Sequence, residues 1–389
     1  MRVAVVVSHP IQHFCPQYSS WAKLDNIEVK VFFASNAGLR LYTDKNFGRQ
    51  IKWDNLDLSF SHDFLDDADG KTVDNRIDSV DLNWKLAAFD PQVVIQYGYS
   101  QSLQRRAISW ASRQRIPVIM ISDSELRTPR NILRRAFKRV AVPQIYNRIA
   151  LFFTCGDANE AYLRHYGVGD ERMIRCSFPI DRTIFDASED HKEEARTRIR
   201  ALLAIPASHR VILMAGKFAP WKRQKDLVVF ANRMYAEKRD VSVILVGSGE
   251  MESELRSSAS LVGPGCLVLP GFVQPTQLVE FYYAADLYVH CSSHEPHSLA
   301  ISEAVYSGLP TILSDACGSF GPSDDLQVGR NGFTYRCGDV DDLERKITCL
   351  FDSSHLINMG RASTQIGRRN QNLAHGEALT QALEVLRAV

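Results

Sequence analysis

The chain has 389 residues, 23% of them charged, and a formal net charge of +1. This length exceeds what one hydrophobic core usually holds, so we expect two domains of ordinary size. The near-neutral balance gives no reason to expect non-specific nucleic-acid binding, and 45% hydrophobic residues is ordinary for a globular protein.

The sequence gives no sign of export or of a membrane span. No run of about 18 apolar residues occurs. Residues 1–7 read as a buried strand rather than a signal peptide, because His9 and Pro10 interrupt the apolar run at once. The eight cysteines are scattered without C-x-x-C pairs, so we predict reduced, mostly buried thiols. These features predict a cytoplasmic location.

Short β-branched runs alternate with longer helical patterns along the chain, which predicts parallel strands joined by helical crossovers. The expected strands of the first half are 3–7, 29–33, 93–96, 118–121 and 151–154. After the polar stretch 188–200 the pattern restarts, with expected strands at 211–215, 241–246, 266–269, 287–291 and 311–314. The fold class is therefore α/β with two doubly wound, Rossmann-like domains facing across a cleft. We place the domains at 1–185 and 200–365, with a C-terminal helix at 366–389 packing back on the first.

The segment from 294 to 304 follows an expected strand and leads into a helix. Pro296 keeps Glu295 out of helical geometry, while Glu303 lies about one turn into the helix. The N–H groups of His297, Ser298 and Leu299 would be unpaired at the helix start and would form a phosphate seat. The alternative is a surface loop followed by an ordinary helix with a solvated glutamate.

Two lysines follow the expected strand 211–215. Lys217 comes directly after Gly216, and Lys222 follows five residues later. Two cations on a loop that leaves a strand can clamp a diphosphate from the side opposite the helix start. Solvated surface lysines are the alternative.

Here the second half resembles retaining glycosyltransferase family four of the GT-B fold, whose E-x7-E motif matches the spacing of Glu295 and Glu303. The likeness runs in order through the C-terminal half. The agreeing stretches are Val246-Gly247-Ser248-Gly249, Gly271-Phe272-Val273, Ala284 to Val289, Gly308-Leu309-Pro310 and Gly329 to Phe333.

The resemblance implies roles for individual residues. Lys217 and Lys222 would bind the donor diphosphate and stabilise the departing nucleotide. Glu295 would hold the donor sugar and Glu303 the ribose hydroxyls. Amides of the helix start, together with Gly216, would meet sugar and phosphate, and Phe272 and Val273 would grip the nucleobase.

The turn Gly247-Ser248-Gly249 could instead indicate a dinucleotide site. Glu252 stands where a G-x-G-x-x-G motif needs its third glycine, so the sequence argues against that interpretation.

The first half carries the expected acceptor side. Residues 8–12 read S-H-P-I-Q directly after the first strand, which resembles a subset of the same family. We assign acceptor contacts to His9, Gln12 and His13, and to Trp53 in a later loop that also contains Asp44, Phe47 and Gly48. His9 satisfying backbone groups at a strand end, and Trp53 as a core residue, are the alternatives.

The family often places a histidine after the strand 118–121, whereas this chain has Ser122-Asp123-Ser124-Glu125. Asp123 is our candidate catalytic group, with Glu125 as the alternative. The family's retention is ascribed to front-face attack, in which the leaving phosphate takes the acceptor proton and no protein nucleophile is required.

A cationic amphipathic helix is expected at 128–142. Seven basic residues and no acidic one lie between Arg127 and Ile149. One face of this helix carries Ile132, Leu133, Ala136, Phe137 and Val140. Such a helix can lie on an anionic membrane surface, here the inner face, near a lipid-linked acceptor. The alternative is that the apolar face packs on its own domain.

These features predict a glycosyltransferase that takes a UDP-, GDP- or ADP-sugar and a glycan or lipid-linked acceptor in bacterial surface polysaccharide or glycoconjugate synthesis. The alternatives are a sugar-nucleotide epimerase or another GT-B enzyme, and a non-catalytic sugar-nucleotide-binding protein. We expect no cofactor and no metal, because no D-x-D motif follows a strand and the lysine pair supplies the positive charge.

Overall fold

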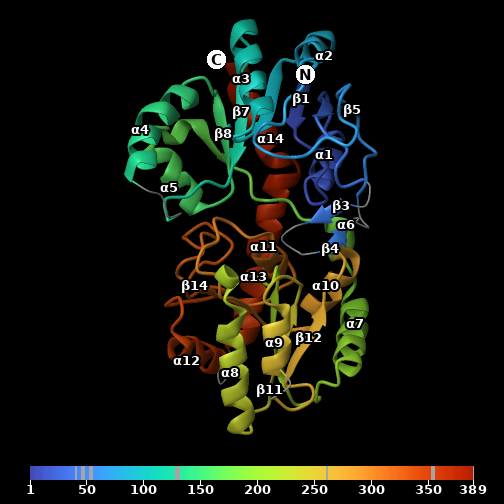
Figure 1. Cartoon of the computed structure of the whole chain (residues 1–389), viewed down its shortest axis with the longest axis vertical. Helices are drawn as coiled ribbons and strands as arrows, with labels where there is room; N and C mark the ends of the chain where they lie inside the picture. Colours follow the sequence, from blue (N-terminus) through green and yellow to red (C-terminus); the bar gives the residue numbers. More distant parts are fainter. Residues whose placement is uncertain are drawn as a thin grey trace. The chain divides into compact units, whose positions relative to one another are not determined.

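The computed structural model describes residues 1–39, 42–44, 49–51, 56–127, 132–259, 262–351 and 355–388. Contacts divide the chain into two compact units, each built on its own parallel sheet (Figure 1). Unit 1 comprises Met1–Tyr42, Ile51–Asp181 and Asn370–Val389, and unit 2 comprises Thr43–Gln50 and Arg182–Arg369.

Unit 1 contains a seven-stranded sheet in the order β5-β2-β1-β6-β7-β8-β9. All its neighbouring strands pair in parallel. The strands are β1 (Arg2–Val7), β2 (Glu28–Phe33), β5 (His62–Phe64), β6 (Val93–Tyr97), β7 (Val118–Ser122), β8 (Leu151–Thr154) and β9 (Met173–Arg175).

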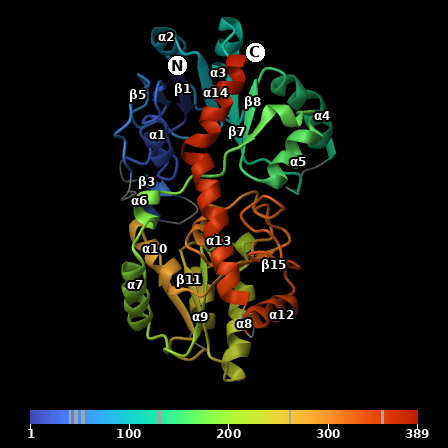
Figure 2. The same cartoon turned by 180° about the vertical axis from the view of Figure 1, so that it is seen from behind.

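Both faces of this sheet are covered, which explains why its strands read as continuous apolar runs. Val3, Val5 and Val7 pack with helices α1 (Cys15–Trp21) and α14 (Ala378–Ala388). Ala4 and Val6 pack in the other cluster. That cluster includes residues of α2 (Leu82–Phe89), α3 (Ser102–Gln114), α4 (Ile132–Tyr146) and α5 (Asp157–His165). Figure 2 shows α14, in red, lying along this sheet. Its buried residues Ala378, Leu379, Ala382 and Leu383 are those of the helical pattern in the sequence.

Unit 2 contains a six-stranded sheet in the order β12-β11-β10-β13-β14-β15. Its neighbouring strands also pair in parallel. The strands are β10 (Arg210–Ala215), β11 (Val241–Val246), β12 (Leu267–Gly271), β13 (Leu287–His290), β14 (Thr311–Ser314) and β15 (Gly332–Tyr335). The helices of unit 2 are α6 (Arg182–Phe185), α7 (Glu189–Leu202), α8 (Gln224–Ala236), α9 (Glu252–Ala259), α10 (Pro275–Ala284), α11 (Leu299–Tyr306), α12 (Val340–Phe351) and most of α13 (His355–Asn372).

The stretch that we expected between the domains is part of unit 2. Residues 182–199 lay outside the predicted second domain, yet they belong to unit 2 together with the rest of α7. An ion-pair cluster holds α7 against unit 2. Arg196 and Arg200 of α7 bind the two carboxylate oxygens of Asp286 at 2.6 and 2.9 Å. Part of the polar composition that suggested a linker therefore holds a packed helix on unit 2.

All ten strands expected from the sequence are present. The strands that we did not predict include β5, β9 and β15, which each form an edge of a sheet, and the two-stranded pair β3 (Tyr42–Asp44) with β4 (Arg49–Ile51). These segments have three or four residues, which is too short to show a clear periodicity of apolar and polar side chains. None of the eight cysteines forms a disulfide and five are buried, as predicted. Within the described ranges, no helix combines the length and the apolar character needed to cross a bilayer.

Candidate functional site

The predicted donor residues gather where the winding of unit 2 reverses. Strand β10 has β11 on one side and β13 on the other, so the loops after β10 and β13 run apart. Ligands of open α/β sheets bind at such a switch point, beyond the carboxyl ends of the strands. Lys217 follows β10, Glu295 follows β13, and Cys317 follows β14. Tertiary structure thus brings residues about 80 positions apart to one edge of the sheet.

The backbone of Glu295 is fixed by the loop after β14. The N–H of Gly318 donates to the Glu295 carbonyl at 2.7 Å. A Cβ atom at Gly318 would lie 1.9 Å from the carbonyl oxygen of Pro296, so only glycine permits this close approach. Gly318 is thus a supporting residue that the sequence patterns did not single out.

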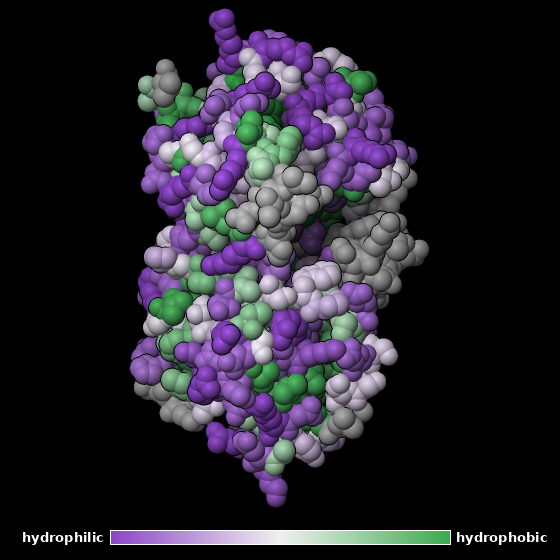
Figure 3. All heavy atoms as spheres, turned by 60° about the vertical axis from the view of Figure 1, so that its left-hand side comes forward, coloured by the Kyte–Doolittle hydropathy of each residue, from purple (hydrophilic) through white to green (hydrophobic). Residues whose placement is uncertain are grey.

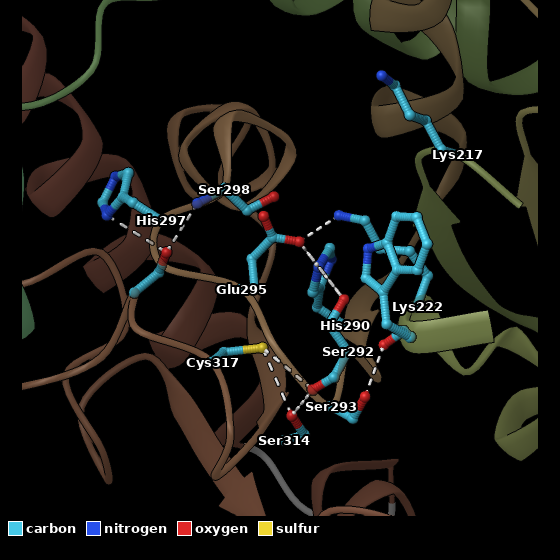
Figure 4. A network of polar contacts seen from close by, with 12 residues as sticks. Lys217, Lys222, His290, Ser292, Ser293, Glu295, His297, Ser298, Ser314 and Cys317 are labelled. Carbon is cyan, nitrogen blue, oxygen red and sulfur yellow. Dashed lines mark hydrogen bonds and ion pairs between the residues drawn. The ribbon is translucent and has the colours of Figure 1, made fainter. Parts of the chain in front are cut away.

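The carboxylate of Glu295 is held by three donors (Figure 4). Its Oε2 forms an ion pair with Lys222 and lies 3.2 Å from Nε2 of His290 and 3.4 Å from the Ser292 hydroxyl. The side chains of Lys222 and Glu295 are only 13% and 15% exposed. Burial opposes ionisation, but the hydrogen bond from His290 and the charge of Lys222 lower the pKa of Glu295 to about 2. Glu295 is therefore a carboxylate at neutral pH and not a proton donor.

Lys217 lies on a loop that packs against the glycine turn after β11. Gly216 donates its N–H to Val246, and Phe218 donates to Ser248, at 2.9 and 2.8 Å. Gly247 has a φ of 149°, and a Cβ there would meet the Gly216 carbonyl at 1.9 Å. The turn therefore supports the Lys217 loop. Figure 4 shows the Lys217 side chain apart from the Lys222–Glu295 contact.

The start of helix α11 carries the three amides that we expected to seat a phosphate. Ser298 is the N-cap, and its N–H donates to the Ser319 hydroxyl at 3.1 Å. The same hydroxyl lies 3.4 Å from Nδ1 of His297. The Ser319 hydroxyl thus accepts a hydrogen bond from one of the three amides of the expected phosphate site. Leu299 is the first residue of the helix, where N–H groups lack intrahelical partners.

One group of side chains near this helix start has the composition of a metal site. Each of His297, Asp324 and Asp325 offers a ligand atom within 4.8 Å of the other two, and all three residues are buried. Asp325 already accepts a 2.6 Å hydrogen bond from the Ser302 hydroxyl and lies 3.4 Å from His297 Nε2. This network is part of the support of α11. The independence from metal that the sequence suggests stays a prediction.

Glu303 lies within α11 and faces Tyr282 of α10. The Tyr282 hydroxyl donates to Glu303 Oε2 at 2.7 Å and is 3.3 Å from the Ala300 carbonyl. Burial raises the pKa of Glu303 to about 7, although the bond from Tyr282 opposes this. Glu303 therefore changes its protonation state near neutral pH, unlike Glu295.

Phe272 and Val273 follow β12, at the same edge of the sheet as the lysines. Both residues are half-buried. Because β11 separates β12 from β10, the expected nucleobase contacts lie two strands from Lys217.

Comparison with known proteins identifies this half of the chain. Residues 195–367 match the family model described as "Glycosyl transferases group 1". These residues form a group 1 glycosyltransferase domain. The group 1 domain contains every predicted donor residue, from Gly216 to Glu303.

Two curated relatives illustrate the likeness. The lipopolysaccharide core biosynthesis glycosyltransferase LpsE of Rhizobium meliloti is 30% identical over 185 residues, which cover 47% of this chain and 50% of LpsE. The GDP-mannose-dependent alpha-mannosyltransferase of Mycolicibacterium smegmatis is 29% identical over 165 residues, covering 42% and 39% of the two chains. The matches therefore span half or less of the length of these relatives.

Both units resemble parts of solved structures. The Anabaena protein HepE, crystallised with UDP, superposes with a TM-score of 0.71 and 16% identity over 100% of both chains. At this identity the likeness shows the fold, which is the GT-B fold that the resemblance implied.

Another hollow of unit 2 lies away from these residues. It has a volume of about 790 Å³, and its lining includes Arg210, Tyr306 and Arg361. Because Arg210 is the first residue of β10, this hollow reaches the amino edge of the sheet and not the carboxyl edge, where the predicted donor residues lie.

Unit 1 has its own hollow at the carboxyl ends of β6 and β7, with a volume of about 460 Å³. Asp123 is exposed and lines this hollow, together with Lys138. Glu125 is buried, and its carboxylate lies 3.6 Å from Arg127. Of the two acids after β7, Asp123 is therefore the one open to a ligand. The hollow is also lined by the aromatic residues Phe14, Tyr97, Tyr99 and Phe178.

His9, Gln12 and His13 lie on the loop after β1 and are partly buried. Burial lowers the pKa of His9 and of His13 to about 4, so both rings are neutral at pH 7. The His13 ring lies 4.4 Å from that of Phe14, which lines the hollow. Trp53, like Phe47 and Gly48, lies outside the described residues.

The predicted basic helix corresponds to α4, whose described part runs from Ile132 to Tyr146 and thus extends four residues beyond the expected end. Residues 128–131 and the side chains of 132–135 are outside the described part. Phe137 and Val140 are 74% and 66% exposed. For these two residues the alternative of packing on their own domain is wrong, because α4 buries Val142 and Tyr146 instead.

Three supporting residues were missed from the sequence: His290, Gly318 and Tyr282. His290 had one detectable signal, since it is a polar residue in the apolar run that forms β13. Gly318 and Tyr282 act through contacts with distant residues and gave no local pattern.

Proposed function

We propose that this protein transfers a sugar from a nucleotide-sugar donor to a hydroxyl acceptor with retention at the anomeric carbon. One observation carries the proposal: a buried, ionised Glu295 is paired with Lys222 at the switch point of a group 1 glycosyltransferase domain. Burying this charged pair carries an unfavourable desolvation free energy. Such pairs are typical of binding sites rather than of contacts that stabilise the fold.

The donor would bind with its diphosphate between the lysine loop and the start of α11. Lys217 and Lys222 supply positive charge, and the first amides of α11 supply N–H donors. Glu295, as an acceptor-only carboxylate, suits the hydroxyl groups of the transferred sugar. Glu303 suits the ribose hydroxyls, and Phe272 with Val273 the base.

The proposed reaction depends on electrostatic stabilisation of the leaving group more than on a side chain that donates a proton. The bond between C1 of the sugar and the phosphate oxygen breaks, and the acceptor oxygen bonds to C1 from the same face. The acceptor proton passes to the leaving phosphate, whose charge Lys222 and Lys217 stabilise. No metal is needed for this scheme, because the lysines neutralise the leaving group.

The acceptor would occupy the hollow of unit 1. Its aromatic rings suit the apolar faces of a sugar, and Asp123 suits the hydroxyl groups. His9, Gln12, His13 and Trp53 complete the acceptor side in this proposal. As neutral rings, His9 and His13 can each donate one hydrogen bond and accept another.

We place the reaction in synthesis of a bacterial surface polysaccharide or glycolipid. The name of the relative LpsE supports this class of product. Exposed Phe137 and Val140, beside the basic residues of α4, suit an anionic membrane surface carrying a lipid-linked acceptor.

Hydrolysis of UDP-, GDP- and ADP-sugars tests the function most directly. We expect one nucleotide class to be turned over slowly, with the anomeric configuration retained in NMR spectra of the released sugar. Glu295→Gln should abolish turnover while the circular dichroism spectrum is unchanged. Tight nucleotide binding without turnover, even with mixed glycan and lipid acceptors, would favour the non-catalytic alternative.

A further inference from the structure

His290 ends strand β13 and lies beside Glu295 (Figure 4). Its Nε2 is 3.2 Å from Glu295 Oε2, and its Nδ1 is 3.1 Å from the hydroxyl of Tyr288. Ser292 places its hydroxyl 2.9 Å from Nε2. His290, Tyr288 and Ser292 have no exposed surface, so bulk water cannot replace any of these contacts.

The positions of the protons follow from the groups that surround the ring. A carboxylate can only accept, so a bare Nε2 facing Glu295 would bring two lone pairs together at 3.2 Å. With the hydrogen on Nε2, the ring donates to Glu295 and to the nearer Ser292 hydroxyl oxygen, and Nδ1 accepts from the Tyr288 hydroxyl. The opposite tautomer would turn the Tyr288 hydroxyl toward the Ala215 carbonyl, a longer contact of 3.4 Å.

We propose that His290 is a positioning residue, an Nε2–H tautomer whose Nδ1 accepts from Tyr288, that fixes the carboxylate of Glu295 where it pairs with Lys222. The kinetic consequence rests on the proposed function, whereas the tautomer and the state of Glu295 concern the free protein. His290 would never touch the donor, so its effect passes entirely through Glu295.

The surrounding charges agree with a neutral ring. Burial lowers the pKa of His290, and the nearby charge of Lys222 acts in the same direction, while Glu295 opposes it. The other titratable groups that face this pair are Tyr288 on β13 and Cys317 after β14, and burial keeps both in their neutral forms. Lys222 is thus the cation and Glu295 the anion of the cluster, with His290 as a neutral donor between Tyr288 and Glu295.

The first experiment reads the tautomer in the intact, ligand-free protein. Long-range ¹H–¹⁵N NMR on histidine-labelled protein should show a protonated Nε2 and an unprotonated Nδ1 for His290. Tyr288→Phe removes the hydrogen-bond donor to Nδ1, so the hydrogen should stay on Nε2 while the Nδ1 resonance shifts to that of a nitrogen without a hydrogen bond. Tyr335→Phe, equally buried but two strands away on β15, should not shift this resonance. A wild-type ring protonated on Nδ1 alone, or on both nitrogens at pH 7, overturns the proposal.

The second experiment separates positioning from packing. His290→Leu fills the space but cannot donate, whereas the side-chain amide of His290→Gln can. We expect His290→Leu to raise the pKa of Glu295 in carboxyl ¹³C NMR, and to lower kcat about tenfold with a smaller change in KM. His290→Gln should restore both. Equal behaviour of the two folded variants overturns the proposal. If neither variant folds, the wild-type and Tyr288→Phe spectra still decide it. If no nucleotide sugar is turned over, the proposed function fails, but the NMR measurements still decide this inference.

Discussion

The Tyr282 hydroxyl donates a 2.7 Å hydrogen bond to the Glu303 carboxyl group, yet the pKa of Glu303 stands at about 7. A buried acid whose pKa is raised from 4.5 is more stable in its protonated form. Its contribution to stability is therefore complete below pH 4.5 and is lost as the pH rises through 7, by at most about 3 kcal/mol.

This gives a first prediction. The melting temperature of the wild type should fall relative to that of Glu303→Gln between pH 5 and pH 8, because the neutral amide cannot ionise. Thermal unfolding of both proteins at the two pH values measures the difference. A constant gap between the two melting temperatures would contradict the raised pKa.

A second prediction concerns Lys222. Lys222→Met should lower kcat at least about 100-fold, because it removes a cation from the leaving group. It should also destabilise the fold by about 3 kcal/mol, because Glu295 would remain buried and charged. Adding Glu295→Gln should recover most of the stability but none of the activity. Lys225→Met, which breaks an exposed pair with Glu254, is the control and should leave both nearly unchanged.

A third prediction uses the close approach at Gly318. Gly318→Ala adds a Cβ 1.9 Å from the Pro296 carbonyl, so the loop carrying Glu295 must move. We expect a loss of about 1–3 kcal/mol in stability and a larger loss in nucleotide-sugar turnover. Gly169→Ala is the matched control, because its Cβ would meet the flexible end of Glu171. Native turnover in Gly318→Ala would show that the Glu295 loop tolerates displacement.

The fourth prediction is metal independence. Turnover should survive dialysis against EDTA, since the lysines neutralise the diphosphate in the proposed mechanism. The activity of treated protein, with and without added magnesium or manganese, measures this. Loss of turnover on chelation and its recovery with metal would refute the prediction. His297, Asp324 and Asp325 would then be the candidate metal ligands.

The fifth prediction concerns α4. The protein should sediment with vesicles that contain phosphatidylglycerol at low salt, and Phe137→Ser with Val140→Ser should weaken this binding. Val229→Ser removes an exposed apolar side chain from α8 and serves as the control. The surface shown in Figure 3, with the side of α4 turned forward, is a mosaic of small apolar groups among hydrophilic side chains. Equal sedimentation of all variants would exclude α4 as the contact.

The sequence by itself determined the ten main strands and the two-sheet organisation, and it predicted the donor residues. Apolar runs at regular spacing and the lysine and glutamate motifs are local patterns, so they can be read along the chain. The sequence left Glu125 as an alternative to Asp123, and it gave Glu295 and Glu303 different roles without distinguishing their ionisation. Only the tertiary structure distinguishes them, because His290 and Lys222 keep Glu295 ionised against the effect of burial, whereas burial raises the pKa of Glu303 despite the hydrogen bond from Tyr282. These partners come from other segments of the chain, and the parallel sheet order brings them to one edge.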